Sequence, residues 1–227
     1  MGVYRVPSFN FPGYISHPIT LNSTLKGIVK DILHSGGHTA PLLHVEYADG
    51  KSYLLCAPEG VRIGEEIQAS GSELIEAKPG NIMPLKHIPE GTIVHNLESH
   101  PGDGGRFVRS AGSAAKVLAK FDDHVEVLLP SKKRKDFLPN CRAAIGVIAG
   151  GGRLEKPFYK AGKKYHRMEV RNKRYPRVAG LAMNAVNHPY GGSRTHKKNK
   201  PTIARRDAPP GAKVGMLRPR RTGRKKR

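Results

Sequence analysis

The positive charge of this chain is concentrated at one end, and that asymmetry limits how the chain can fold. Residues 1–152 carry 16 lysines and arginines against 15 aspartates and glutamates, whereas residues 153–227 carry 24 against 3. Like charges at such density oppose compaction unless a polyanion supplies counter-charge. The sequence therefore predicts a nearly neutral folded body followed by a basic extension that binds nucleic acid.

Other features narrow the class of protein. The sequence contains no run of about 18 apolar residues, so we expect no transmembrane helix and no membrane partner. Its beginning lacks the apolar segment of a signal peptide. Two cysteines, Cys56 and Cys141, are too few for a disulfide framework and suit a reducing compartment. We expect a cytoplasmic protein.

The body is typical of an all-β protein. Short apolar runs are separated by glycine and proline turns such as Asp49-Gly50, a pattern that favours small β-barrels. The expected strands are 25–33, 42–47, 53–57 and 66–69, then, after a joint at 81–84, 92–97, 115–121, 125–129, 137–138 and 144–148. No amphipathic helix is convincing, and we expect an irregular basic extension after the second barrel. The resulting domains are 1–79, 80–152 and 153–227.

The extension carries the strongest functional pattern. Between residues 156 and 177, cations alternate with aromatic residues such as Phe158 and Tyr165. Cations neutralise phosphates, and aromatic faces stack on unpaired bases, whereas a merely solvated tail explains neither the aromatic nor the proline content. The expected phosphate contacts of the extension are Arg153, Lys156, Lys163, Arg167, Arg171, Arg174, Arg177, Arg194, Arg221 and Arg224.

Two glycine-rich segments are candidate backbone contacts. The segment 101–109 contains Arg106 and Arg109, which are positioned to grip an RNA backbone, although a plain wide turn explains the glycines equally well. It is not the phosphate loop of a nucleotide hydrolase, because no Gly-Lys-Ser/Thr follows. Gly150-Gly151-Gly152 is either a flexible exit into the extension or a place where the backbone lies flat on RNA.

A loop at 183–192 contains His188, whose ordinary pKa of about 6.5 suits general acid or base catalysis. Catalysis also needs a nucleophile and an orienting group within reach, and none is evident. We favour a structural or RNA-contacting role for His188, together with Asn184. Histidine pairs such as His34 and His38 lack further ligands at zinc spacing, so no metal and no cofactor are expected.

Ordered segments along most of the chain resemble one family. The chain is similar to the universal second protein of the large ribosomal subunit (the L-two family) in its archaeal and eukaryotic form. The resemblance runs from about residue 24 to the C-terminus. The segments that carry it are Ala57-Pro58-Glu59-Gly60, residues 101–105, residues 141–153, Lys156-Pro157, residues 183–189 with Gly191-Gly192, Ala208-Pro209-Pro210-Gly211 and Arg221-Thr222-Gly223-Arg224.

The resemblance implies an OB-fold-like barrel, then an SH3-like barrel, then a tail threaded through rRNA. It implies binding to large-subunit rRNA and to other ribosomal proteins, contact with the small subunit at an intersubunit bridge, and support of tRNA binding and the peptidyl transferase centre. The family histidine that matches His188 is not regarded as catalytic, so no enzyme is expected. Asn187 and Tyr190 depart from bacterial relatives, which tend to have an acid and often a histidine there.

Two alternatives stay open. A non-ribosomal DNA-compacting or regulatory protein shares the basic charge, but no helix-turn-helix, homeodomain or zinc-finger pattern supports it. An enzyme built around His188 requires turnover by the isolated protein that His188→Ala abolishes.

Overall fold

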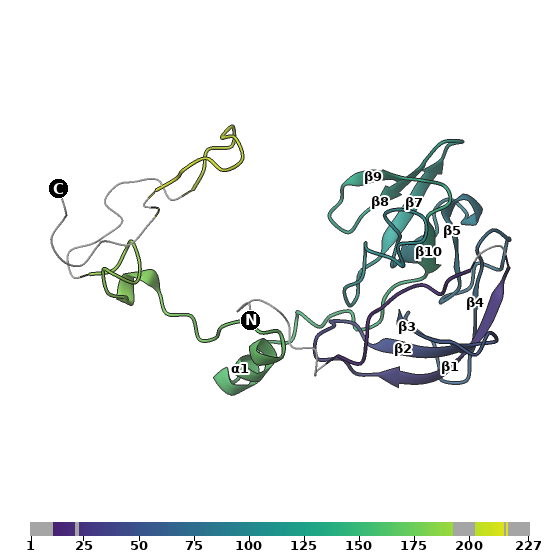
Figure 1. Cartoon of the computed structure of the whole chain (residues 1–227), viewed down its shortest axis with the longest axis horizontal. Coiled ribbons are helices and arrows are strands. Elements are labelled where there is room, and N and C mark those ends of the chain that lie inside the picture. Colours follow the sequence, from purple (N-terminus) through teal and green to yellow (C-terminus); the bar gives the residue numbers. More distant parts are fainter. Residues whose placement is uncertain (1–10, 21–22, 193–202, 216, 218–227) are drawn as a thin grey trace. The chain divides into compact units, whose positions relative to one another are not determined.

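The computed structural model describes residues 11–20, 23–192, 203–215 and 217. Contacts divide the chain into two units, Met1–Lys173 and Arg174–Arg227. The described part of the first unit contains a ten-stranded sheet with the order β3-β2-β1-β4-β5-β10-β6-β7-β8-β9 (Figure 1). The predominance of strands confirms the expected all-β class.

The first group of strands forms around one apolar core. Its members are β1 (Leu25–Leu33), β2 (Leu42–Tyr47), β3 (Ser52–Cys56) and β4 (Glu66–Ala69). β1 lies between β2 and β4, and both pairings are antiparallel. Alternate side chains such as Val29, Val45 and Ile67 point inward and are buried, as the two-residue period of a strand requires.

The second group forms around a separate core. Its members are β6 (Ile93–His95), β7 (Ala115–Lys120), β8 (Val125–Leu128), β9 (Arg134–Phe137) and β10 (Arg142–Ile145). β7, β8 and β9 form an antiparallel meander. Val117, Val127 and Phe137 are buried beneath it. The strand expected at 137–138 begins earlier, at Arg134, because the basic residues Arg134 and Lys135 form its first half.

The expected joint at 81–84 is itself a strand, β5 (Ile82–Pro84), followed by a short 3-10 helix at Leu85–His87. β5 pairs with β4 in parallel through Ala69 and Ile82, and with β10 antiparallel. Three residues ending in proline give no detectable period, which is why the sequence pattern missed this strand. β5 and β10 thus connect the two groups of strands within one sheet.

A buried ion pair fixes the segment before β1. The Arg142 guanidinium donates to the Glu98 carboxylate at 2.7 Å, and Glu98 is fully buried. The same guanidinium donates to the Pro18 carbonyl at 2.6 Å and to the Thr20 hydroxyl at 2.9 Å. His17 Nε2 lies 2.6 Å from the Asn96 carbonyl oxygen. Residues 17–20 are therefore held against both the Glu98 segment and β10.

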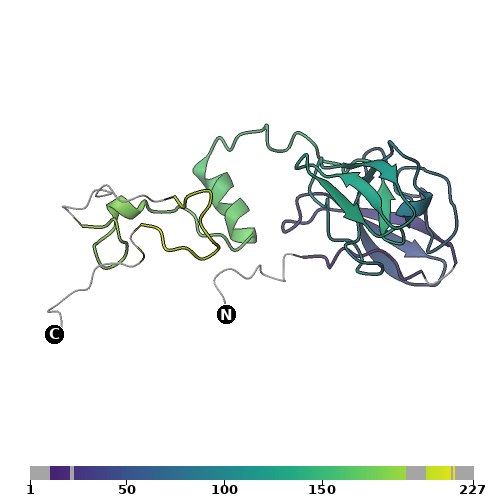
Figure 2. The same ribbon diagram turned by 90° about the horizontal axis from the view of Figure 1, so that it is seen from above.

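The expectation of an irregular extension after residue 152 is wrong for one segment. Residues Ala161–Val170 form an α-helix, α1 (Figure 2). Two backbone bonds close its C-terminus, from Asn172 N to Glu169 O and from Lys173 N to Met168 O, with Asn172 at φ +49°. This is a Schellman cap, for which asparagine is one of the few residues that tolerate the left-handed conformation. Asn172 was the local signal that the sequence reasoning overlooked.

The predicted domain boundaries at 79/80 and 152/153 stay predictions. The two units of the chain meet at a different position, between Lys173 and Arg174. Ala144 of β10 packs in the core of the first group of strands, so the two groups share structure across the first predicted boundary.

Two further observations bear on the class of protein. Within the described ranges, no helix has both the length and the apolar character needed to cross a membrane. Cys56 and Cys141 are both unpaired and buried, and burial raises the pKa of each thiol to about 11. Both thiols therefore stay protonated and unreactive in the folded protein at neutral pH.

The Glu98–Arg142 pair gives a stability prediction. Arg142→Met leaves the Glu98 carboxylate buried without its counter-charge, so the free energy of unfolding should fall by about 3–5 kcal/mol in a denaturant titration. The matched control is Arg134→Met, because Arg134 pairs with Glu126 at 3.4 Å on the exposed surface. That change should cost about 0–1 kcal/mol. Equal losses for the two variants would contradict the assignment.

Two buried histidines predict a pH dependence of stability. Burial lowers the pKa of His17 and of His95 to about 4, and the charge of Arg142 reinforces the shift at His17. Between pH 6.5 and about 4.5 the unfolded chain binds protons that the folded chain does not, so the free energy of unfolding falls as the pH falls.

The variant His17→Gln keeps a donor for the Asn96 carbonyl and cannot titrate. It should flatten the pH dependence by up to about 1.4 kcal/mol per pH unit in that window. Chemical denaturation at a series of pH values measures the slope. An unchanged slope would mean that His17 does not resist protonation in the folded state.

Candidate nucleic-acid interface

The glycine-rich loop at 101–105 is fastened from inside by two carboxylates. Glu98 accepts bonds from the amides of Gly102 at 3.2 Å and Gly104 at 3.3 Å. Asp103 accepts bonds from the amides of Gly105 at 2.9 Å and Ser99 at 2.9 Å. These amides already donate hydrogen bonds within the protein, so they are not available to bind a ligand. The geometry favours the wide-turn interpretation of the glycines.

The same contacts set the charge state of Asp103. Burial acts to raise the pKa of this carboxyl, but the bonds from Gly105, Ser99 and His100 outweigh it and hold the pKa below its usual range. Asp103 is therefore ionised at neutral pH and keeps the loop closed.

The two arginines of this loop lie in different settings. Arg106 is exposed, as a phosphate contact requires. The Arg109 guanidinium donates to the Gly105 carbonyl at 3.1 Å and to the Ile15 carbonyl at 3.2 Å. Arg109 thus ties the loop to the segment before β1, and its predicted RNA contact would have to use its remaining donors.

The glycine exit at 150–152 is an ordered turn. Gly150 and Gly152 adopt φ values of +82° and +72°, which other residues rarely tolerate. A Cβ on Gly112 would lie 2.6 Å from the Gly151 Cα, so the two backbones touch. The amide of Gly112 also donates to the Ile148 carbonyl at 3.0 Å. Of the two roles expected for this segment, a flexible exit does not fit these contacts.

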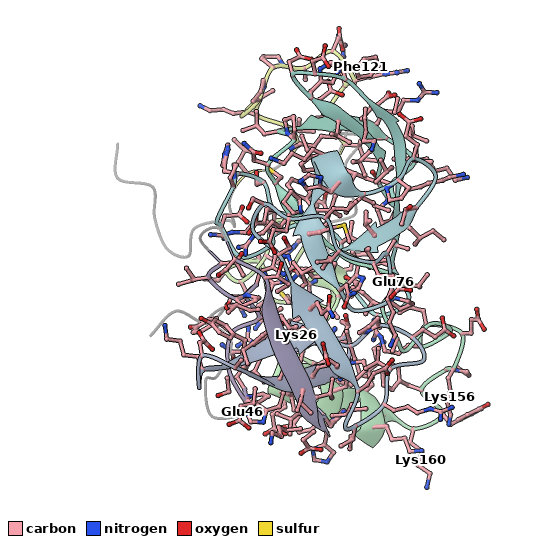
Figure 3. The ribbon with its side chains drawn as sticks, turned by 90° about the vertical axis from the view of Figure 1, so that its right-hand side faces the viewer. Lys26, Glu46, Glu76, Phe121, Lys156 and Lys160 are labelled. Atoms are coloured by element: carbon pink, nitrogen blue, oxygen red, sulfur yellow. The ribbon has the colours of Figure 1, made fainter. Side chains whose placement is uncertain are left out.

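Past this turn, all residues from 151 to 163 are exposed. They include the predicted contacts Arg153, Lys156 and Lys163, none of which takes part in an ion pair within the described ranges. Phe158 and Tyr159 are also exposed, at 51% and 77%. Figure 3 shows Lys156 and Lys160 pointing outward beside α1. The sequence reasoning missed Lys160, which lies at the beginning of a helix that it did not predict.

The body carries a different kind of surface. A shallow hollow of about 310 Å³ over β1, β2 and β4 is lined by two lysines and two glutamates, together with Ile28, Tyr47 and Ala48. Lys26 pairs with Glu66 at 3.8 Å, and Lys30 pairs with Glu46 at 3.0 Å. Lys26 and Glu46 are labelled in Figure 3. Because its charges are balanced, this face attracts a polyanion less than a surface of unpaired cations would.

The second unit contains the predicted contacts Arg174, Arg177, Asn184 and His188. Arg174, Arg177 and Asn184 are exposed, and His188 is half-buried. Arg194, Arg221 and Arg224 lie outside the described residues.

The loop around His188 is closed by its own backbone. A 3-10 helix at Gly180–Ala182 leads into it, and the Gly192 amide donates to the Met183 carbonyl at 3.1 Å. The Tyr190 amide donates to His188 Nδ1 at 3.1 Å, which places the proton of a neutral imidazole on Nε2. The ring also lies against Gly180, where a Cβ would come within 2.4 Å of it. His188 is thereby oriented as a hydrogen-bond donor.

No group of three or more metal-binding side chains occurs among the described residues. His38 instead lies 2.8 Å from the Ser35 hydroxyl and contacts the Phe11 ring edge-on.

Comparison with known proteins identifies the family. Residues 78–209 match the family model described as Ribosomal Proteins L2, C-terminal domain. The chain is 46% identical to the large ribosomal subunit protein uL2 of Methanococcoides burtonii, over 98% of this chain and 93% of the relative. It is 47% identical to uL2 of Haloquadratum walsbyi, over 97% and 90%, and 45% identical to uL2 of Methanothermobacter thermautotrophicus, over 98% and 93%.

The chain therefore belongs to a family of ribosomal proteins. That family is the ribosomal protein L2 family, also named uL2, as the resemblance in the sequence indicated. Its members are structural constituents of the ribosome and not enzymes, which agrees with the expectation for this chain.

The His188 loop gives a local prediction. A Cβ on Gly191 would lie 2.2 Å from the Asn184 carbonyl oxygen, a backbone atom that cannot rotate away. Gly191→Ala should open the loop and break the bond from the Gly192 amide to Met183. Amide hydrogen exchange at Gly192 should accelerate at least ~10-fold, because that amide loses its acceptor.

The control is Gly162→Ala in α1, where a Cβ meets nothing within 4 Å. It should stabilise the helix by up to about 1 kcal/mol and leave Gly192 exchange unchanged. Unchanged exchange in Gly191→Ala as well would disprove the closed loop.

Proposed function

We propose that this protein is a structural constituent of the large ribosomal subunit that binds rRNA directly and acts in the cytoplasm. One observation carries the proposal: nearly the whole chain matches proteins named large ribosomal subunit protein uL2. Arg153, Lys156 and Lys163 support it, because they are exposed and form no ion pair within the described residues, so each can neutralise an RNA phosphate and release a counterion.

Within this role the first group of strands is an OB-fold-like barrel and the second an SH3-like barrel, as the resemblance implies. The domains 1–79, 80–152 and 153–227 are the corresponding units of function, and the last of them threads between rRNA helices. The partners are large-subunit rRNA, other ribosomal proteins and the small subunit at a bridge. Through them the protein supports subunit association, tRNA binding and the peptidyl transferase centre.

The proposed mechanism is electrostatic and geometric. The nearly neutral body, with an apolar core in each group of strands, holds the start of the extension in a fixed position. Cations on the extension offset phosphate repulsion where rRNA helices converge. The proposed RNA contacts are Arg106, Arg109, Arg153, Lys156, Lys163, Arg167, Arg171, Arg174, Arg177, Asn184, His188, Arg194, Arg221 and Arg224. His188 acts here as an oriented donor to RNA.

Sedimentation of a lysate through a high-salt gradient tests the assignment. Co-migration of the chain with the large subunit after the salt wash is the expected result. Release into the soluble or DNA-bound fraction would favour the alternative, a non-ribosomal basic nucleic-acid-binding protein. Competition between structured RNA and duplex DNA would then separate the two functions.

Charge reversal tests the role of the extension. The double variant Arg171→Glu/Arg174→Glu should weaken rRNA binding at moderate salt at least ~10-fold, and the slope of log K against log salt should fall by about 2. The control Lys116→Glu/Lys133→Glu changes the net charge equally at exposed positions of the body. Filter binding at several salt concentrations measures both variants. Equal effects would mean that net charge alone drives binding.

A further inference from the structure

Three arginines from two parts of the first unit lie close together. Arg167 and Arg171 are four residues apart on α1 and its C-cap, so they share one face of the helix. Both are half-buried, as are Met168 and Val170 beside them. Arg153, which follows the glycine turn, lies within electrostatic reach of both.

The scaffold beneath this cluster is fixed. Val170 packs directly on the body, since a Cβ on Gly36 would lie 2.6 Å from its Cγ1 atom. The Schellman cap at Asn172 fixes the backbone that carries Arg171. On the other side, the contact between Gly112 and Gly151 anchors the turn before Arg153. The three side chains therefore project from ordered backbone.

The cluster has unpaired donors, and no carboxylate among the described residues forms an ion pair with it. Arg171 Nε and Nη2 are buried and have no hydrogen-bond partner among the described residues. Burial lowers the pKa of Arg171 and of Arg167, and the neighbouring arginine charges lower both further. Unpaired buried donors and like charges at close range both cost free energy.

The carboxylates that lie nearest to these arginines in sequence, Glu155 and Glu169, do not neutralise them. Glu169 faces His166 at 3.3 Å. Glu155 Oε2 lies by Gly152, about 3.5 Å from where a Cβ would stand. Neither forms an ion pair with the three arginines within the described ranges. An external anion would supply the counter-charge that these arginines lack among the described residues.

We propose that Arg153, Arg167 and Arg171 form a single phosphate-binding site, assembled before RNA arrives, that holds one phosphodiester group of an rRNA strand. A guanidinium offers a planar fork that binds phosphate oxygens in pairs, which a lysine cannot do. The exposed cations and aromatic rings at 156–160 lie between Arg153 and α1 in the sequence and are available to contact neighbouring nucleotides. This inference rests on the proposed rRNA binding, and it adds that the three arginines are a rigid contact point for the rRNA strand.

Lysine substitutions in the full-length chain test the site, because they keep the charge and remove the fork. Arg171→Lys, Arg167→Lys and Arg153→Lys should each weaken binding to transcribed large-subunit rRNA about 10-fold at fixed salt. Arg134→Lys, at an exposed position of the body, should change binding less than 2-fold. Because the three groups hold one phosphate, Arg167→Lys/Arg171→Lys should lose much less than the product of the two single losses.

Thermal melting of each variant checks that it folds. If Arg171→Lys unfolds, Arg153→Lys decides the question, because Arg153 lies outside the helix. Lysine variants that bind like Arg134→Lys, or losses that multiply independently, would overturn the shared site while leaving rRNA binding intact. Failure of the unaltered chain to bind rRNA at all would instead reject the proposed function.

Discussion

The buried pair between Glu98 and Arg142 holds together parts of the chain that are far apart in sequence. Burying two charges is costly, and the pair is favourable only because its other hydrogen-bonding atoms are also satisfied. Glu98 holds the glycine loop by two amides, and Arg142 holds Pro18 and Thr20. The segment before β1, the loop at 101–105 and β10 therefore meet at one ionic contact.

Sequence patterns predict most strands of this fold, because strands such as β4 and β8 bury alternate side chains. The prediction of β1, β2 and β4 is correct to the residue. β5 was missed because it has three apolar residues and no polar partner in its period. α1 was missed for a different reason: it is stabilised by Val170 on Gly36 and by the cap at Asn172, not by an apolar stripe of its own. Neither contact is visible to a local pattern.

The candidate interface, too, could be predicted from the sequence only in part. Charge asymmetry identifies the extension because charge is additive along a sequence, whatever the fold. The role of an individual cation depends on its partners, and sequence cannot distinguish Arg106, which is exposed, from Arg109, which is bonded to two carbonyls. The glycines of 101–105 are ambiguous for the same reason. Only the structure reveals that their amides face Glu98 and Asp103.

The distribution of charge explains how a chain with a net charge of +22 can be stable before it binds RNA. The body is nearly neutral, and its cations on β1 are paired, so it folds without a polyanion. α1 is an intermediate case, since it packs on the body but carries arginines that form no ion pair within the described part of the chain. Its charges cannot spread apart to relieve repulsion. Binding an RNA phosphate at these arginines therefore costs less conformational entropy than binding it with a freely moving tail, because the backbone is already ordered.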